Sequence, residues 1–236
     1  MGGKSKLARS IAQTILNTEQ IRESYVEPFV GGGSVFAQVA PHFQHSQALD
    51  LSPDLILMWQ AVQEGWVPPT EVSEEQYAEL KASPPSALRG FVGYGGSFGG
   101  KWFGGYARGG LQASGAPRNH QAESSRAVMK VAASIADSSV TFTYADYRSA
   151  TITPGTVVYC DPPYAGTQQY HAVEPFDSEE FWATMMEWYH LGAYIFVSEY
   201  AAPEGWTCIW EQRHRQSLVQ PKQGRHETTE RLWTHL

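Results

Sequence analysis

Apolar residues along the chain recur with two different periods, which predict a mixture of helices and strands. Apolar side chains every three or four positions predict helices over residues 6–16, 53–61, 121–135 and 178–189. Short runs, most of them rich in β-branched and aromatic residues, predict strands over residues 24–29, 46–50, 140–144, 156–160, 193–198, 206–211 and 230–234. Strands that alternate with helices in this way indicate the α/β class.

The alternation is interrupted between residues 65 and 135. A short polar helix is expected at residues 74–81, and residues 90–110 then alternate glycine with six aromatic side chains. Glycine disfavours regular structure, so we expect residues 90–110 not to pack as a regular helix. Residues 65–135 are therefore predicted to be an insertion into a sheet domain made of residues 1–64 and 136–236.

The composition of the chain narrows the classes of protein to which it can belong. The chain has 236 residues, of which 42% are hydrophobic, enough for one α/β domain with a smaller insertion. No apolar run approaches the roughly 18 residues of a membrane span, and the N-terminus lacks the apolar core of a signal peptide, so a cytoplasmic protein is expected. Cys160, Cys208 and the scattered histidines show no metal-ligand spacing, so neither a metal site nor a disulfide framework is expected.

Positive charge is concentrated in the insertion. The net charge of the chain is −7, which argues against a wholly basic nucleic-acid binder. Residues 86–135, however, contain six Lys and Arg residues against Glu123 alone. Aromatic rings among cations suit stacking on bases and contact with phosphates. The candidate nucleic-acid contacts are Tyr94, Lys101, Trp102, Arg108 and Arg118.

Two alternatives for this segment stay open. Its aromatic side chains could instead pack into the core as part of a flexible loop. Nucleic acid could also contact the basic C-terminal stretch around Arg213, Arg215, Lys222 and Arg225.

A glycine-rich turn follows the first predicted strand and precedes a helix that starts near Ser34. Glycine lets the backbone approach a ligand, and a helix N-terminus offers free N–H groups, so this turn is typical of nucleotide sites. Phe36 stands where a dinucleotide fingerprint has its third glycine, which disfavours NAD. Asp50 ends the next strand, where it could accept hydrogen bonds from a ribose or cap the following helix. Lys4 could reach an anionic ligand or be a solvated lysine.

The tetrapeptide Asp161-Pro162-Pro163-Tyr164 follows an apolar run, residues 156–160, with the length and β-branched content of a buried strand. Ligands of α/β sheets bind where strands end. Two prolines stiffen the turn and remove two N–H donors, which leaves carbonyl acceptors beside the Asp161 carboxylate and the ring of Tyr164. Two acceptors and an aromatic face suit a planar base that carries an exocyclic amine.

Five features in this order resemble the Dam-like, D12 class, S-adenosylmethionine-dependent DNA adenine-N6 methyltransferases. They are GGKS at residues 2–5, EPFVGGGSVF at 27–36, Asp50, Asp146 and DPPY at 161–164. The glycine- and aromatic-rich insertion and the TERLW ending resemble phage-borne relatives. The resemblance implies a Rossmann-like methyltransferase sheet with helices on both faces, an inserted target-recognition module, S-adenosylmethionine as cofactor and double-stranded DNA as partner.

The resemblance also implies site residues. The cofactor would contact Lys4, Glu27, Phe29, Gly31, Gly33, Asp50, Asp146 and Asp161. Asp161, Pro162, Pro163 and Tyr164 would form the catalytic motif, in which Asp161 and the Pro162 carbonyl hold the amine of an adenine rotated out of the duplex. No metal is implied.

Two other functions remain open from the sequence. Related tetrapeptides serve methyltransferases that act on RNA or on a protein amide. A catalytically silent DNA-binding protein of the same fold is the second, because relatives usually carry an aromatic residue before GGK and this sequence begins at Met1.

Overall fold

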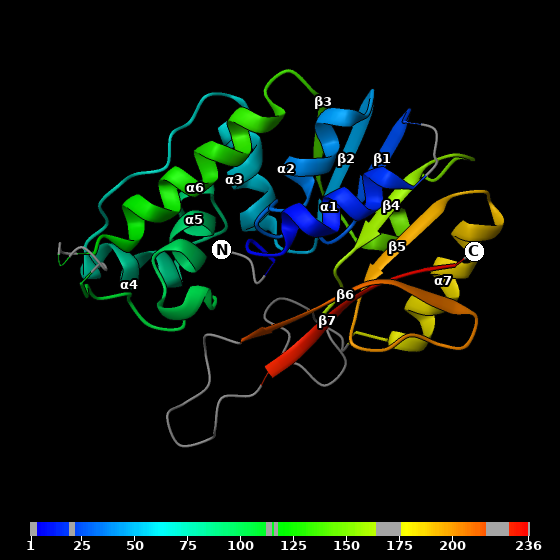
Figure 1. Ribbon diagram of the computed structural model, residues 1–236. Coiled ribbons are helices and arrows are strands. Elements are labelled where there is room, and N and C mark those ends of the chain that lie inside the picture. The colour runs from blue at the N-terminus through cyan, green and yellow to red at the C-terminus, as the bar shows by residue number, and fades with distance from the viewer. Residues whose placement is uncertain are drawn as a thin grey trace.

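A seven-stranded sheet organises the protein (Figure 1). The computed structural model describes residues 4–18, 22–111, 115, 118–163, 176–215 and 227–235. The strands are β1 (Ser24–Glu27), β2 (His45–Asp50), β3 (Ser139–Tyr144), β4 (Val157–Cys160), β5 (Tyr194–Ser198), β6 (Trp206–Arg215) and β7 (Glu227–His235). They lie in the order β3-β2-β1-β4-β5-β7-β6. Every predicted strand is confirmed, and the last two are longer than the pattern indicated.

The first five strands are parallel, and the last two form an antiparallel pair at one edge. β1 pairs in parallel with β2 and β4, and β7 pairs antiparallel with both β5 and β6. The chain order reverses between β1 and β4, which is the switch point where open α/β sheets bind ligands. The carboxyl ends of β1 and β4 are therefore the expected place for a site.

Helices cover both faces of the sheet. They are α1 (Ala8–Asn17), α2 (Phe36–Val39), α3 (Pro53–Gln63), α4 (Glu74–Ala82), α5 (Ala87–Gly95), α6 (His120–Ile135) and α7 (Ser178–His190), with 3-10 turns η1 (Ala40–His42), η2 (Phe98–Gly100) and η3 (Tyr147–Ser149). One core cluster contains Tyr25 and Tyr159 with residues of α1, α2, α3 and α6. The alternate positions Val26 and Val158 join a second cluster with α7. Neighbouring strand residues thus face opposite layers, as the period of two requires.

The expectation that residues 90–110 do not pack as a regular helix is wrong for residues 90–95, whereas residues 96–110 form no α-helix. Residues 87–95 form α5, and its glycines permit close packing. A Cβ at Gly90 would lie 2.2 Å from the Asp54 carbonyl oxygen on α3, and one at Gly93 would lie 2.3 Å from the Trp102 ring. Glycine lowers the intrinsic stability of the helix, but tertiary packing outweighs that cost here.

The helix ends settle the alternative role of Asp50. α1 begins at Ala8, and Leu7 occupies its N-cap without a side-chain hydrogen bond. Ser52, not Asp50, caps α3, since the Ser52 hydroxyl accepts the Leu55 N–H. These helix ends place Lys4 before α1 and leave Asp50 without a capping role at α3.

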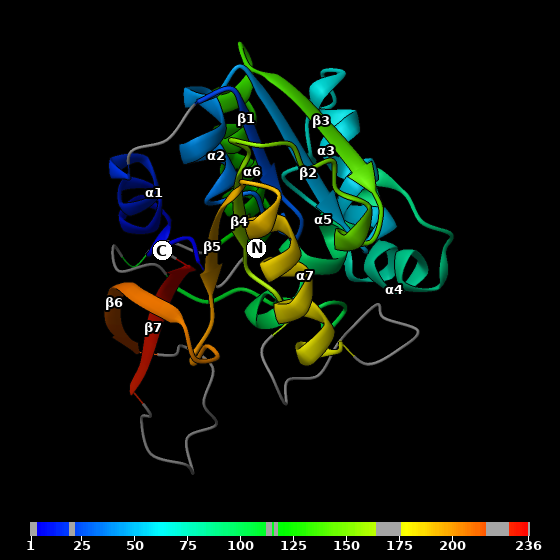
Figure 2. The same ribbon diagram turned by 90° about the vertical axis from the view of Figure 1, so that its right-hand side faces the viewer.

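The predicted insertion lies to one side of the sheet. Helices α4, α5 and α6 gather there, away from β6 and β7, in both Figure 1 and the turned view of Figure 2. The division at residues 65 and 135 stays a prediction. Among the helices of the described residues, none is long and apolar enough to cross a membrane.

Candidate active site

Acidic side chains converge at the carboxyl ends of the central strands. Glu27 ends β1, Asp50 ends β2, Asp161 directly follows β4 and Glu199 directly follows β5. The sheet therefore brings together three of the predicted site residues, and Lys4 joins them from the N-terminal segment. In the described residues, no group of His, Cys, Asp and Glu side chains has the arrangement of a metal site.

The glycine turn is held in shape by Asp50. Gly31 N–H donates to Asp50 Oδ2 at 2.9 Å, and Ser52 N–H donates to Oδ1 at 2.8 Å. Burial raises the pKa of Asp50, and these two hydrogen bonds oppose the rise. Gly31 and Gly33 both have positive φ, and a Cβ built on Gly31 would meet no atom within 4 Å. The turn therefore leaves open space beside its backbone that a ligand can approach.

Glu27 is a buried acid between two other carboxylates. Its side chain accepts a hydrogen bond of 2.7 Å from the Tyr25 hydroxyl, and the residue is 3% exposed. Burial raises the pKa of Glu27 well above its ordinary value; the Tyr25 bond lowers it, and the charges of Asp161 and Asp50 raise it further. The environment of Glu27 thus favours the protonated form, unlike a carboxylate that faces a cation.

Asp161 lies beside Lys4. Its carboxylate Oδ1 is 3.2 Å from Lys4 Nζ, and its side chain is 28% exposed. Pro162 is buried and Pro163 is half-buried. Tyr164 lies outside the described residues, so its predicted role stays a prediction. The described part of the motif thus places a partly accessible carboxylate at the sheet's switch point.

Phe29, which follows β1, packs in a group of aromatic side chains. Its ring stacks on Tyr147 with centroids 5.4 Å apart and meets Phe181 edge-on at 5.9 Å. Tyr147 belongs to η3 and Phe181 to α7, so Phe29 links the turn after β1 to both elements. Phe29 remains half-buried.

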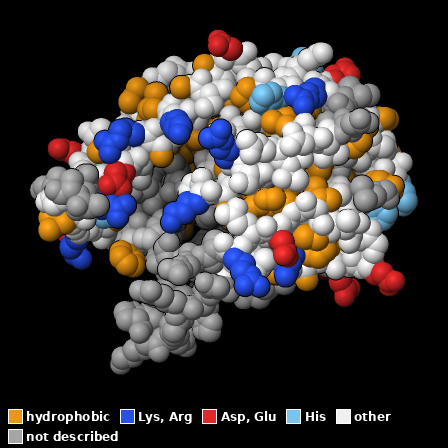
Figure 3. Space-filling view, in the orientation of Figure 1, with side chains coloured by type: hydrophobic (Ala, Val, Ile, Leu, Met, Phe, Trp, Pro, Cys, Tyr) orange, Lys and Arg blue, Asp and Glu red, His pale blue; other side chains and the backbone are white. Residues whose placement is uncertain are grey.

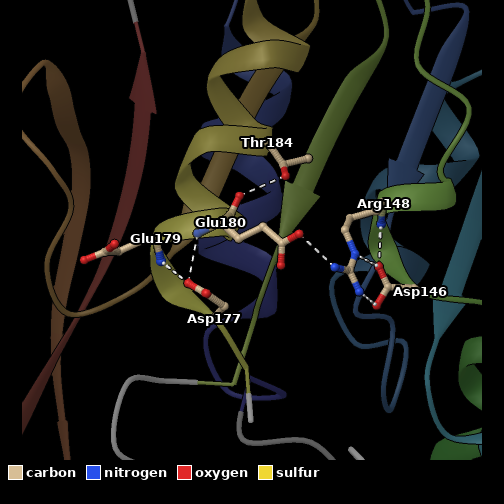
Figure 4. A network of polar contacts seen from close by, with 6 residues as sticks. All are labelled: Asp146, Arg148, Asp177, Glu179, Glu180 and Thr184. Carbon is tan, nitrogen blue, oxygen red and sulfur yellow. Dashed lines mark hydrogen bonds and ion pairs between the residues drawn. The ribbon is translucent and has the colours of Figure 1, made fainter. Parts of the chain in front are cut away.

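Asp146 is bound by a neighbouring arginine (Figure 4). Arg148 Nε donates to Asp146 Oδ1 at 2.7 Å, and Arg148 Nη1 contacts Glu180 of α7 at 2.8 Å. Burial acts to raise the pKa of Asp146, but the bonds from Arg148 lower it overall. Asp177 caps α7 through the N–H groups of Glu179 and Glu180. Asp146 is thus ionised and held in place, with Arg148 tying η3 to α7.

The predicted nucleic-acid residues fall into two groups. Tyr94 and Trp102 are half-buried and touch each other, with ring centroids 4.8 Å apart. Lys101, Arg108 and Arg118 are exposed. Arg108 pairs with Glu74, and Arg118 pairs with Glu123 at 2.8 Å. Both pairs are at the surface, where salt and competing phosphates weaken such contacts.

Not all of the positive charge counted in the sequence faces solvent. Arg89 pairs with the buried Asp54 at 2.5 Å, so it serves the packing of α5 on α3. Lys and Arg side chains nonetheless gather around a hollow beside α4, α5 and α6 (Figure 3). The face of the molecule in this view is suited to a polyanion.

Two acids near Asp161 were missed by the sequence reasoning. Glu230 of β7 contacts Lys4 Nζ at 2.5 Å and is 2% exposed. Glu199 accepts the Tyr200 N–H at 2.9 Å, and burial raises its pKa. The available signal for Glu230 was its position two residues before Leu232, because alternation places both side chains on the same face of a strand.

Comparison with known proteins gives one family. The model of the D12 class N6 adenine-specific DNA methyltransferases matches residues 1–84 and 112–185, which is more than half of the chain. Among curated proteins, no sequence matches significantly.

Several solved structures are similar at low identity. The N-methyltransferase NodS from Bradyrhizobium japonicum WM9 is 7% identical with a TM-score of 0.44, and the match covers 98% of this chain and 96% of NodS. Magnesium protoporphyrin IX methyltransferase (ChlM) from Synechocystis PCC 6803, solved with bound SAM, is 10% identical with a TM-score of 0.41, covering 99% and 80%. The tRNA (m1A58) methyltransferase TrmI from Aquifex aeolicus is 9% identical with a TM-score of 0.41, covering 99% and 69%.

Proposed function

Since the chain belongs to the D12 class N6 adenine-specific DNA methyltransferase family, and is therefore a methyltransferase with a Rossmann-like sheet, we propose that it methylates N6 of adenine in double-stranded DNA. S-adenosylmethionine is the proposed methyl donor. The observation that carries the proposal is the partly accessible Asp161 carboxylate, which follows β4 at the switch point, next to β1, the strand that leads into the glycine turn.

The residues at the strand ends fit an adenosine-containing cofactor. The open space at Gly31 admits a ligand close to the backbone, and Asp50 ends the adjacent strand, where ribose hydroxyls are recognised. Asp146, ionised and fixed by Arg148, offers acceptor oxygens one strand further along the sheet. When bound, the cofactor supplies a methyl group already activated by its sulfonium, so the chain needs no nucleophile of its own.

The protein's contribution is position and charge. The Asp161 carboxylate and the Pro162 carbonyl accept the two N6 hydrogens and direct the nitrogen lone pair towards the methyl group. Asp161 need not be a strong base, because the methylated amine cation is very acidic. The target base must leave the duplex, which costs a few kcal/mol that the pocket offsets.

The proposal is tested by assaying transfer of labelled methyl groups to DNA, RNA and protein. Methylation confined to duplex DNA, together with sequencing of methylated bases in DNA from expressing cells, supports the proposal and gives the recognition sequence. Labelling of RNA or protein alone contradicts it. Binding of S-adenosylmethionine with no transfer to any of the three would identify a silent protein of this fold.

Asp50→Ala should weaken binding of S-adenosylmethionine. Loss of a charge-assisted hydrogen bond costs roughly 1.5–3 kcal/mol, or about 10- to 150-fold in affinity. Titration calorimetry measures the change. Asp50→Asn is the matched variant: its amide oxygen still accepts one of the two N–H groups that shape the turn, and its affinity should fall less. Unchanged affinity in a folded Asp50→Ala protein would reduce Asp50 to a turn residue.

Neutralising Lys101 and Arg108 together should reduce the salt dependence of DNA binding. Each lost phosphate contact lowers the slope of log K against log salt by about 0.9, so a double Gln variant should lose nearly two units of slope. Lys6 and Arg9, which are exposed on the N-terminal segment, provide a control pair with the same change of charge. An unchanged slope would move the DNA site to the C-terminal basic stretch around Arg213.

A further inference from the structure

A buried carboxylate on the last strand holds the cation beside Asp161. Lys4 Nζ lies 2.5 Å from Glu230 Oε1 and 3.2 Å from Asp161 Oδ1. Glu230 is 2% exposed and Lys4 8% exposed. A buried charge is tolerated only when it is paired, so Lys4 and Glu230 fix each other in place across 226 residues of sequence.

The contacts of Lys4 with Glu230 and with Asp161 differ in length. Its shorter contact is to Glu230, which faces little solvent, and its longer one is to Asp161, which is partly exposed. One ammonium group is thus shared by two carboxylates, and the trio keeps a negative charge. That charge lies where Asp161 is accessible to a substrate.

We infer that Glu230 is a positioning residue, which holds Lys4 so that the Asp161 carboxylate is oriented but only partly neutralised when it accepts the substrate amine. The inference rests on the proposed function, because it assumes that Asp161 receives an amine hydrogen. Without Glu230, Lys4 would pair more strongly with Asp161, and the amine would compete with an ammonium group for the same oxygens. The expected loss is therefore in the transfer step, not in binding.

Each variant that tests this changes one side chain near Asp161. Among the described residues, the titratable groups that interact electrostatically with Asp161 are Lys4, Glu27, Tyr159, Cys160, Glu199 and Tyr200, and Glu230 pairs with Lys4. Glu230→Gln removes one negative charge and keeps the shape. Lys4→Met removes the positive charge and keeps the aliphatic length. Glu211→Gln, in the exposed ion pair with Arg231 between β6 and β7, is the matched control.

The experiment is single-turnover methylation of duplex DNA as a function of pH. Glu230→Gln should slow transfer about tenfold or more while affinities for S-adenosylmethionine and DNA stay within about twofold. Loss of a negative neighbour favours ionised Asp161, so the midpoint of the acid limb of the rate profile should move to lower pH. Lys4→Met should move it to higher pH. Glu211→Gln should change neither rate nor midpoint.

Several outcomes would overturn the inference. An unchanged rate and midpoint in Glu230→Gln would leave Glu230 with a structural role, while active wild-type protein would keep the proposed function intact. Midpoints that move the same way in both variants would exclude charge sharing through Lys4. If wild-type protein transfers no methyl group, the proposed function fails, and the premise that Asp161 accepts an amine fails with it.

The contact itself can be measured without activity. Burial acts to lower the pKa of Lys4, but Asp161 and Glu230 raise it overall. In an NMR titration of the Lys4 ammonium group, Glu230→Gln should therefore lower its pKa, and Glu211→Gln should leave it unchanged. A Lys4 pKa that is the same in Glu230→Gln and in wild type would show that Glu230 does not hold this cation.

Discussion

Asp161→Asn is expected to slow methyl transfer by about 10²–10³-fold, the range for loss of one preorganised polar group at a reacting centre. The amide keeps the shape of the side chain but carries no charge, so the amine is held less well as positive charge develops on its nitrogen. Single-turnover rates with saturating DNA and cofactor measure the effect. Binding of duplex DNA should change little, because the proposed phosphate contacts are made by other residues.

Asp177→Asn is the matched control for this change. Asp177 is exposed and caps α7, and asparagine caps a helix about as well as aspartate. The same chemical substitution should therefore leave transfer unaffected there. Full activity in Asp161→Asn would remove the proline-flanked carboxylate from the centre of the proposed mechanism.

A second variant separates the two roles proposed for the motif. Tyr164→Ala should chiefly weaken capture of the flipped base, since stacking is worth roughly 1–3 kcal/mol per base. A mismatch opposite the target lowers the cost of unpairing, and should rescue Tyr164→Ala more than Asp161→Asn. Equal rescue of both variants by mismatched duplexes would mean that the roles are assigned wrongly.

Gly90→Ala is expected to destabilise the folded protein by about 3 kcal/mol, at the upper end of the usual cost of overpacking. The new Cβ would lie 2.2 Å from the Asp54 carbonyl oxygen, and backbone cannot move aside as a side chain can. α5 must shift away from α3, which also strains the ion pair between Arg89 and the buried Asp54. For a chain of this size, the melting temperature should fall by about 6–12 °C.

Gly110→Ala provides the comparison for Gly90→Ala. Gly110 is exposed, and a Cβ there would meet no atom within 4 Å. Alanine at such a position stabilises by about 0.4–1 kcal/mol through the unfolded chain. Thermal unfolding of both variants tests the packing argument, which fails if Gly90→Ala melts no lower than Gly110→Ala.

The strands could be predicted because most of them are short apolar runs, and the pattern that indicates a strand lies within the run itself. Val157 to Cys160 is buried at every position, as a central parallel strand requires, and the run could be found from composition alone. The position of Asp161 followed, since it comes directly after that run. Asp50 could likewise be placed at a strand end because it follows the apolar residues of its strand directly.

The packing of the insertion could not be predicted from local preference. Glycine-rich sequence favours irregular backbone, yet α5 forms because Gly90 and Gly93 let α3 and Trp102 approach closely. These contacts are tertiary, so they leave no periodic pattern in the local sequence.

The contact of Lys4 with Glu230 could not be predicted for the same reason. The two residues are far apart in the sequence, and only the order of the strands brings them together.

The position of β7 between β5 and β6 affects how the chain folds during synthesis. β6 leaves the ribosome first but pairs with β7, not with β5. Until β7 emerges, β5 keeps an unpaired edge, and such edges invite pairing with other chains. The strand that closes this edge also carries the carboxylate for Lys4. Nascent chains that lack β7 are therefore expected to be both prone to aggregation and without the finished charge arrangement around Asp161.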